Sequence, residues 1–255
     1  MKKLDYFIVG TQKGGTTALF KKMTSNEQFY RQTKKEIHFF DRENINWENP
    51  SYTLLNKHFQ DAPTEKYWGD ATPIYMYWPN AIARLHNYNK DAKIIVILRH
   101  PSYRALSHWK METAREEETL DFLTATSENR KNRESSSEKY LRRHSYVERG
   151  FYFQQIICLL KYFDRKNIFF CMTDELFKSE VDLINRIYRF IGAKATYTET
   201  QKKIIKPQNN DNIETSEQWL THLHAIYMDD IEKTATLTGL DLGIWNDAHY
   251  TERPI

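Results

Sequence analysis

The feature that most constrains the fold of this chain is the stretch DYFIVGTQKGGTTAL, residues 5–19. A short apolar run over residues 6–9 is typical of a buried strand, and Gly10 ends it. A turn rich in Gly and Thr follows, and the pattern becomes helical from Thr16. Backbone N–H groups of such a turn, together with the amino end of the next helix, form a cradle for an anion. The stretch therefore predicts a strand, a phosphate-binding loop and a helix.

The position of the lysine separates this loop from that of nucleotide hydrolases. In the P-loop of those enzymes a lysine directly follows the last glycine, but here Thr16 follows Gly15 and the lysine is Lys13. A hydrolase that binds Mg-ATP also uses an acidic residue after a strong strand, whereas the strand pattern over residues 93–98 is followed by Arg99. A P-loop kinase or NTPase is the alternative interpretation, and both observations count against it.

Strand and helix patterns alternate along the rest of the chain. Strands are expected over residues 6–9, 67–70, 93–98 and 167–172, and helices over residues 16–25, 74–87, 101–114, 150–163 and 181–191, with a final helix and an irregular tail over residues 215–255. The main part of the helix over residues 74–87 is expected to begin at Pro79. Residues 29–40 are expected to form a loop and a strand. Strands that are almost continuously apolar are typical of a parallel sheet covered by helices. The pattern predicts a P-loop-like α/β fold of three layers, α/β/α, with a central parallel sheet.

Length and composition fit a single soluble domain. The chain has 255 residues, 40% of them apolar, and no linker divides it, so one domain over residues 1–255 is expected. A net charge of +3 is too small to indicate nucleic-acid binding and fits an anionic small ligand equally well. The first strand begins close to the N-terminus and no apolar run is long enough to span a bilayer, so a cytoplasmic protein is expected. The two cysteines lie outside any CxxC pattern and are expected to be buried free thiols.

Residues 115–149 differ in composition from the rest of the chain, because charged residues and Ser dominate there. One interpretation is a solvated loop or helix face. The other is a mobile region on the substrate side of the protein. Basic pairs at residues 130–131 and 142–143 then suggest an anionic acceptor.

A second anion site is predicted at the end of the strand over residues 93–98. Arg99 follows this strand directly, and Ser107 lies two turns into the helix that comes next. Arginine forms strong and directional bonds to phosphate, so the two side chains are predicted to converge on one phosphate. The alternative is that Arg99 caps the strand and that Ser107 is a solvated helix residue.

Several motifs together resemble the sulfotransferases that use 3′-phosphoadenylyl sulfate (PAPS). GTQKGGTTAL looks like their 5′-phosphosulfate loop, and ILRHPSYRALSHW looks like their 3′-phosphate segment. KKEIHFFD, residues 34–41, and DATPIYM, residues 70–76, resemble segments of the carbohydrate (heparan-type) branch and its bacterial relatives. RGFYFQQIICLLKYF matches a recurring helix start. These motifs keep the family's order and spacing over residues 5–192, and ordered motifs are far more specific than single ones.

The resemblance implies a role for each matching residue of the donor site. Lys13 would contact the 5′-phosphate and the bridging oxygen, and would stabilise the charge that develops as the sulfuryl group leaves. The 5′-phosphate would be held by Gly14, Gly15, Thr16 and Thr17. Arg99 and Ser107 would bind the 3′-phosphate and so distinguish PAPS from ATP.

The resemblance also implies the general base. In the carbohydrate branch this base is the Glu of the KEIHFFD-like segment, which is Glu36 here; it would accept a proton from an acceptor hydroxyl or amine. His38 shares one face with Glu36 if the segment is extended, so it is the alternative base, or it orients Glu36 or the sulfuryl group. Asp41 would contact the acceptor or order nearby groups; the alternative is a turn residue at a strand end. Thr72 and Tyr75 would line the acceptor cleft, and the alternative for Tyr75 is packing of the helix.

The implied reaction is in-line transfer of the sulfuryl group, with adenosine 3′,5′-bisphosphate (PAP) as product and a carbohydrate or small metabolite as acceptor. No metal is expected, because the nine His residues show no metal-binding spacing. Lys203 and Lys206, within residues 202–210, either cover the nucleotide or lie in a solvated linker. A further alternative is a non-catalytic nucleotide- or carbohydrate-binding protein on the same scaffold, and the presence of both Lys13 and Glu36 counts against it.

Overall fold

The computed structural model describes residues 2–128, 137–201, 217–247, 250 and 252. Contacts divide the chain into two compact units. The first unit comprises Met1–Leu98 with Ile157–Ile205, and the second comprises Arg99–Ile156 with Lys206–Ile255. The expectation of one domain over residues 1–255 stays a prediction. No helix among the described residues is long and apolar enough to cross a membrane.

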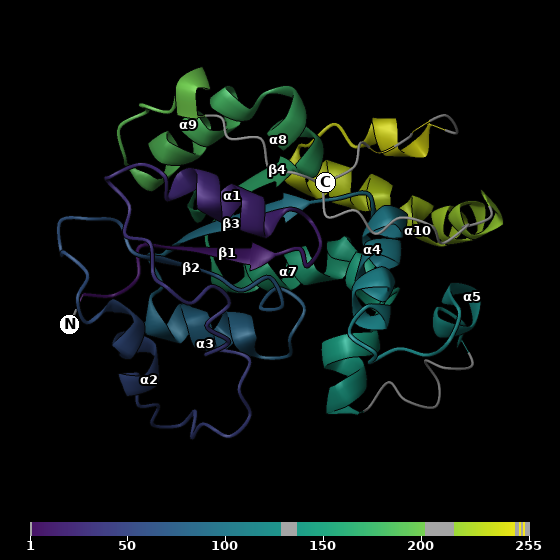
Figure 1. Ribbon diagram of the computed structural model, residues 1–255, viewed down its shortest axis with the longest axis horizontal. Coiled ribbons are helices and arrows are strands. Elements are labelled where there is room, and N and C mark those ends of the chain that lie inside the picture. Colours follow the sequence, from purple (N-terminus) through teal and green to yellow (C-terminus); the bar gives the residue numbers. More distant parts are fainter. Residues whose placement is uncertain (1, 129–136, 202–216, 248–249, 251, 253–255) are drawn as a thin grey trace. The chain divides into compact units, whose positions relative to one another are not determined.

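A parallel sheet forms the centre of the first unit. Among the described residues its strands are β1 (Tyr6–Gly10), β2 (Gly69–Ala71), β3 (Lys93–Leu98) and β4 (Ile168–Met172), in the order β2-β1-β3-β4 (Figure 1). Every neighbouring pair is parallel. Successive residues of β1 and β3 are buried without alternation, as expected for a sheet with both faces covered. The predicted α/β fold with a central parallel sheet is confirmed.

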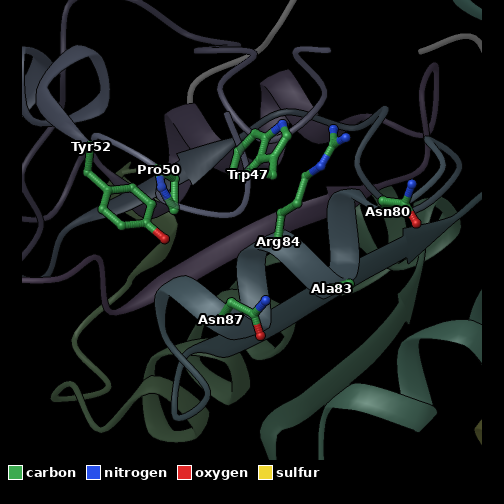
Figure 2. A pocket seen from close by; sticks show the side chains of 7 residues that line it. All are labelled: Trp47, Pro50, Tyr52, Asn80, Ala83, Arg84 and Asn87. Atoms are coloured by element: carbon green, nitrogen blue, oxygen red, sulfur yellow. The ribbon is translucent and has the colours of Figure 1, made fainter. Parts of the chain in front are cut away.

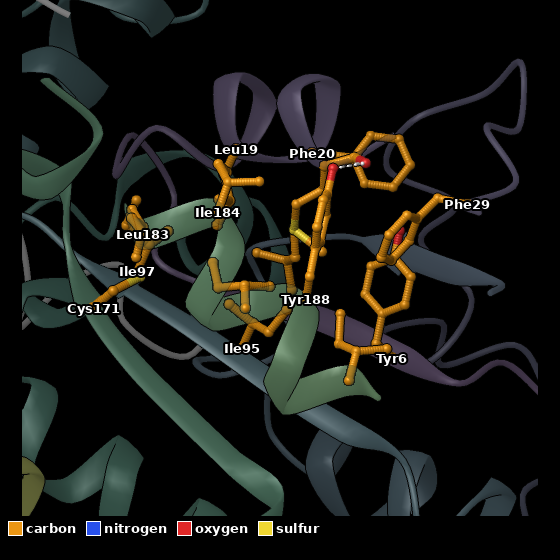
Figure 3. Close-up of a cluster of buried hydrophobic side chains, with 14 of the residues drawn as sticks. Tyr6, Leu19, Phe20, Phe29, Ile95, Ile97, Cys171, Leu183, Ile184 and Tyr188 are labelled. Atoms are coloured by element: carbon orange, nitrogen blue, oxygen red, sulfur yellow. Dashed lines mark hydrogen bonds between the residues drawn. The ribbon is translucent and has the colours of Figure 1, made fainter. Parts of the chain in front are cut away.

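Helices and aromatic side chains cover the two faces of this sheet. One face packs against α1 (Thr16–Met23), α8 (Thr173–Lys178) and α9 (Glu180–Ile191). Leu19 of α1 and Ile184 of α9 pack there with Ile95 of the central strand β3 (Figure 3). On the other face, the Phe7 ring meets Tyr88 of α3 (Ala81–Tyr88) at a centroid distance of 6.3 Å. The strand ends therefore lie between two packed layers.

The second unit is helical in its described part. Its helices are α4 (Pro101–Thr113), α5 (Phe122–Ala125), the beginning of α7 (Tyr152–Tyr162) and α10 (Glu217–Thr238). This unit also contains the π turn Tyr140–His144 and the 3₁₀ turns Glu148–Gly150 and Gly243–Asn246. The short elements of the first unit are α2 (Thr53–Asn56) and the 3₁₀ turns Lys57–Phe59, Arg165–Asn167 and Glu199–Gln201. The Tyr152 hydroxyl donates to the Arg99 carbonyl oxygen at 2.7 Å and connects α7 to the start of this unit.

Most predicted boundaries agree with the structure within two residues, but three expectations are wrong. The strand expected within residues 29–40 is absent from this described segment, because Phe29 forms only an isolated bridge and the backbone turns farther on. The first part of the helix expected over residues 74–87 is not helical, because Asn80 has a φ of 62°. The helix begins at Ala81, two residues after Pro79, where its main part was expected to begin. Cys171 is buried as expected, whereas Cys158 is exposed on α7.

The described part of residues 115–149 contains buried side chains, which include Glu118, Tyr140 and Arg149. Of its two basic pairs, residues 130–131 lie outside the described residues. In the other pair, Arg142 contacts Glu138 at 2.7 Å and Arg143 contacts Glu117 at 2.6 Å. The positive charge of that pair is therefore balanced within the unit. The mobile substrate-side region stays a prediction.

Candidate functional site

The Gly-rich loop between β1 and α1 is held at both of its ends. Thr11 donates from its backbone N–H and from its hydroxyl to the Ile97 carbonyl oxygen of β3, at 2.8 and 3.0 Å. At the other end, the Thr173 hydroxyl lies 2.8 Å from the Gly14 carbonyl oxygen and 3.1 Å from that of Leu98. The loop is thus fixed to the carboxyl end of β3 and to the start of α8.

Two positions of the loop require glycine. A Cβ on Gly14 would lie 2.5 Å from Thr11 Oγ1 and 2.9 Å from the Ile97 carbonyl oxygen. Gly15 has a φ of 89°, in the left-handed region that other residues resist. Gly15 also has no side chain with which to cap α1, so the first N–H groups of the helix depend on other partners. A turn of this kind beside a helix amino end fits an anion such as a phosphate.

The side chains predicted to contact this phosphate begin in the same turn. Lys13 is half-buried, Thr16 is buried at the first position of α1, and Thr17 beside it is exposed. Their contacts with a bound group stay predictions. Lys203 and Lys206, which were predicted to cover the nucleotide, lie outside the described residues.

The three residues predicted to be catalytic share an uncommon backbone conformation. Among the described non-glycine residues, positive φ occurs at Lys13 (67°), Glu36 (61°) and His38 (54°), and at Asn80 and Glu116. Such a conformation costs roughly 1–2 kcal/mol per residue and persists where the surroundings enforce it, often at functional sites. The expectation of an extended segment with Glu36 and His38 on one face is therefore wrong. Their side chains meet because the backbone turns at both residues.

Glu36, His38 and Asp41 form a line of contacting side chains. His38 Nδ1 lies 2.9 Å from Asp41 Oδ2, and His38 Nε2 lies 3.4 Å from Glu36 Oε2. Lys35 Nζ lies 2.9 Å from the other Glu36 oxygen. The Asp41 side chain is fully buried, whereas those of Glu36 and His38 are 39% and 40% exposed. The buried carboxylate therefore anchors a ring and a second carboxylate that solvent reaches.

These contacts move the two pKa values in opposite directions. Burial would raise the pKa of Glu36, but hydrogen bonds from His38 and Lys35 outweigh it and lower this pKa to about 2. Burial would lower the pKa of His38, but hydrogen bonds to Asp41 and Glu36 outweigh it and raise this pKa to about 9. At neutral pH the segment therefore presents a carboxylate and an imidazolium side by side.

Thr72 and Tyr75, which were predicted to line the acceptor cleft, are fully buried. Their hydroxyls donate to Asp70 Oδ2 at 2.8 and 3.0 Å. Their role toward the acceptor stays a prediction. Asp70 was not singled out from the sequence, although an acidic residue one position before the carboxyl end of a parallel strand is a signal of a functional position.

Arg99, the residue predicted to bind the 3′-phosphate, is paired with Glu252, and both residues belong to the second unit. Its Nε lies 2.8 and 2.9 Å from the two oxygens of Glu252, and its Nη2 also contacts one of them. Both side chains are buried. Ser107 is half-buried on α4, and its hydroxyl has no hydrogen-bond partner among the described residues. Convergence of Arg99 and Ser107 on one phosphate stays a prediction. The pair with Glu252 shows that the Arg99 guanidinium can bind a negatively charged group.

A cavity of about 190 Å³ lies between α3 and the segment that carries Trp47 and Tyr52 (Figure 2). Arg84 of α3 lines it, with its guanidinium 4.5 Å from the Trp47 ring centroid and 2.7 Å from a Glu43 oxygen. None of the residues predicted for the site lines this cavity. The candidate site is therefore built from the loop and from residues 36–41, away from the lining of this cavity.

Two curated relatives are similar to parts of this chain. The human heparan sulfate glucosamine 3-O-sulfotransferase 3B1 is 26% identical over 196 residues, which are 75% of this chain and 47% of that protein. The membrane-associated sulfotransferase kil1 of Dictyostelium discoideum is 33% identical over 108 residues, which are 41% of this chain and 22% of that protein. The chain spans about half or less of the length of these relatives.

A solved structure and a family description cover nearly the whole chain. The crystal structure of a sulfotransferase from Alicyclobacillus acidocaldarius has a TM-score of 0.81 and 23% identity, with 97% of this chain and 100% of that chain covered. It shows that the fold is the same. The family described as the sulfotransferase domain matches residues 3–238. The family resemblance inferred from the motifs is confirmed, and the chain belongs to the sulfotransferase domain family.

Proposed function

We propose that this chain transfers the sulfuryl group of PAPS to a hydroxyl or amine of an acceptor and releases PAP. The observation that carries this proposal is the line of Glu36, His38 and Asp41, in which an ionised carboxylate and an imidazolium are open to solvent. Sulfuryl transfer needs a proton acceptor for the attacking group and fixed positive groups for the departing one. The first unit holds the candidate base and the anion-binding loop, and it therefore provides both.

In this proposal the two ends of the donor are bound by different residues. Lys13 and the first N–H groups of α1 bind the 5′-phosphosulfate, and Gly14 and Gly15 allow its close approach. Arg99 and Ser107 bind the 3′-phosphate after Glu252 has been displaced from the guanidinium. PAPS supplies an activated sulfuryl group, and the side chains of this site supply orientation and charge.

Glu36 accepts the proton of the acceptor in this proposal. A pKa of about 2 makes its carboxylate a weak base before the acceptor binds, and each hydrogen bond that it gives up raises this pKa. His38 is already protonated at neutral pH, so it orients Glu36 and contributes positive charge instead of accepting a proton. His38 becomes the alternative base only near and above its pKa of about 9.

The acceptor in this proposal is a carbohydrate or another small metabolite. The support is the KEIHFFD segment together with the similarity to a human protein named for heparan sulfate glucosamine. Transfer from radiolabelled PAPS to neutral and acidic oligosaccharides tests this class. Labelling of other small hydroxyl compounds and of no oligosaccharide would contradict a carbohydrate acceptor.

Calorimetry tests the donor site directly. We expect PAP to bind without a metal and more tightly than ADP or ATP, and Arg99→Ala to weaken PAP binding by roughly tenfold or more, since a charge-assisted pair is lost. A preference for Mg-ATP would support the kinase or NTPase alternative.

In the transfer assay, Glu36→Gln should lower kcat by roughly 10²–10⁴-fold, the usual range for a general base. PAP binding without any transfer by the wild type would support the non-catalytic alternative.

A further inference from the structure

A buried network of three polar side chains lies next to the candidate base. Asp70 at the middle of β2 accepts at one oxygen, Oδ2, from the hydroxyls of Thr72 at 2.8 Å and Tyr75 at 3.0 Å. All three side chains are fully buried. Burial raises the pKa of Asp70, while its hydrogen bonds favour the ionised carboxylate. Burial also holds the pKa of Tyr75 well above its usual value, so its hydroxyl keeps its proton and continues to donate.

The same network receives three successive backbone N–H groups, those of residues 37–39. The first donates to Asp70 Oδ1 at 3.5 Å, the second to the Thr72 hydroxyl at 3.5 Å, and the third to the Tyr75 hydroxyl at 3.0 Å. The first two bonds are long and the third is of normal length. Asp70 therefore binds three adjacent peptide groups, one directly and two through a hydroxyl.

These peptide groups belong to the turn in which Glu36 and His38 have positive φ. A strained backbone persists only when its surroundings determine it. Asp70 is itself held by the sheet, because it lies opposite Phe7 of β1 in a parallel register. A rigid sheet position thus fixes the turn, and the turn determines where the two exposed side chains point.

We propose that Asp70 is a positioning residue of this site, which holds the turn over residues 36–39 so that the Glu36 carboxylate and the His38 ring lie side by side. The effect of Asp70 on catalysis rests on the proposed function, sulfuryl transfer. Asp70 acts through Glu36 and His38, since its fully buried side chain contacts the turn. Thr72 and Tyr75 connect Asp70 to the second and third peptide groups, because each hydroxyl donates to Asp70 and accepts from one backbone N–H.

The charges that face His38 provide a measure of this role that needs no substrate. Asp41 and Glu36 contact its two ring nitrogens, Asp70 interacts with it electrostatically, and Arg42 Nε donates to its carbonyl oxygen at 2.8 Å. Loss of the turn that Asp70 holds moves the ring of His38 away from Asp41 and Glu36, whose contacts stabilise the imidazolium. The pKa of His38 therefore reports on the network.

The experiment compares the wild type with Asp70→Asn and Tyr75→Phe. NMR titration of the His38 ring should give a lower pKa in both variants than the value of about 9 in the wild type. In the transfer assay, kcat should fall by roughly tenfold or more for Asp70→Asn, as expected when a general base is misplaced, while the KM for PAPS stays within about twofold. Tyr75→Phe keeps the buried ring and should give a smaller decrease in kcat.

A matched control separates positioning from a general loss of stability. Asp230 of α10 is also a buried carboxylate that accepts from backbone N–H groups, those of Tyr152 at 2.8 Å and Phe153 at 3.3 Å. Asp230→Asn should lower Tm and leave the pKa of His38 unchanged. If Asp70→Asn does not fold, the pKa of His38 and the kcat of Tyr75→Phe and Thr72→Val are compared with those of the wild type instead.

Two results would overturn the proposal: an unchanged pKa of His38 in the folded variants, or a kcat within twofold of the wild type in a protein that transfers sulfuryl groups. If the wild type transfers none, the proposed function fails, and the titration still decides whether Asp70 holds the turn. The two failures are therefore distinguishable.

Discussion

At the scale of single residues, the candidate site depends on His38 between two carboxylates. The contact with Asp41 fixes one ring nitrogen, and the contact with Glu36 uses the other. Each carboxylate favours the imidazolium, and the imidazolium in turn favours the ionised Glu36. Neither residue alone would have the pKa that it has in this pair.

The raised pKa of His38 predicts a pH-dependent contribution to stability. Its pKa rises from the ordinary value of 6.5 to about 9 on folding, so the contribution is fully present below 6.5 and is lost as the pH rises through 9. The difference in unfolding free energy between wild type and His38→Gln, measured in urea, should therefore decrease with rising pH over this window. A difference that stays constant across it would contradict the assigned pKa.

The same pair predicts the pH dependence of transfer. With Glu36 as base, kcat/KM should be level from weakly acidic to neutral pH and should fall as the pH passes about 9, because the imidazolium beside Glu36 is lost. With His38 as base, the rate should instead increase up to that pH. A pH–rate profile with saturating PAPS distinguishes the two. Lys35→Met is a useful companion, since loss of its hydrogen bond should raise the pKa of Glu36.

At the scale of secondary-structure elements, the conformation of the Gly-rich loop depends on its close packing against β3. Gly14 lies against the backbone of β3, and a Cβ there would meet a carbonyl oxygen that cannot move without the strand. The position of β3, and not the loop sequence alone, therefore determines the conformation of the loop.

Gly14→Ala should accordingly weaken PAP binding, because the loop must move away from Ile97. We expect a loss of roughly tenfold or more, corresponding to the 1–3 kcal/mol typical of overpacking. Gly243→Ala is the matched control, since its nearest contact is a side-chain oxygen of Asp241 at 3.3 Å. Calorimetry with PAP measures both. Equal affinity of Gly14→Ala and wild type would mean that the loop does not bind the nucleotide.

The contact between the C-terminal segment and the start of α4 gives another prediction. The Glu252 carboxylate accepts hydrogen bonds from the Arg99 guanidinium, and a phosphate that binds Arg99 must compete with it. Glu252→Gln should therefore tighten PAP binding by roughly threefold or more, because a neutral amide is a weaker partner than a carboxylate. Glu232→Gln, at an exposed position of α10, should have no effect. Weaker binding by Glu252→Gln would mean that Glu252 helps to hold the nucleotide.

At the scale of the whole molecule, the parallel sheet brings distant segments of the first unit to one edge. The Gly-rich loop follows β1, the segment from Asp70 to Tyr75 spans the end of β2, and Thr173 follows β4. The carboxyl ends of parallel strands lie at the same edge, which is where such folds bind ligands. Motifs that are far apart along the chain therefore lie at the same edge of the sheet.

Much of this arrangement was predictable from local sequence. The strand over residues 93–98 has the predicted ends, and Gly192 ends α9 with a φ of 98° as expected for a helix terminus. The turn at Glu36 and His38 was not predictable, because no local pattern favours positive φ at Glu or His. The pair of Arg99 and Glu252 was not predictable either, since 153 residues separate them.

The sequence by itself determined most of the strands and helices and the Gly-rich loop, because each depends on residues within one short segment, and it determined the family through several motifs that occur in a fixed order over residues 5–192. Only the tertiary structure decided that Asp70 holds the turn of Glu36 and His38, and that Glu252 occupies Arg99. The physical reason is that buried charges and strained peptide groups need partners. Those partners come from whichever segments the packing of the chain brings together.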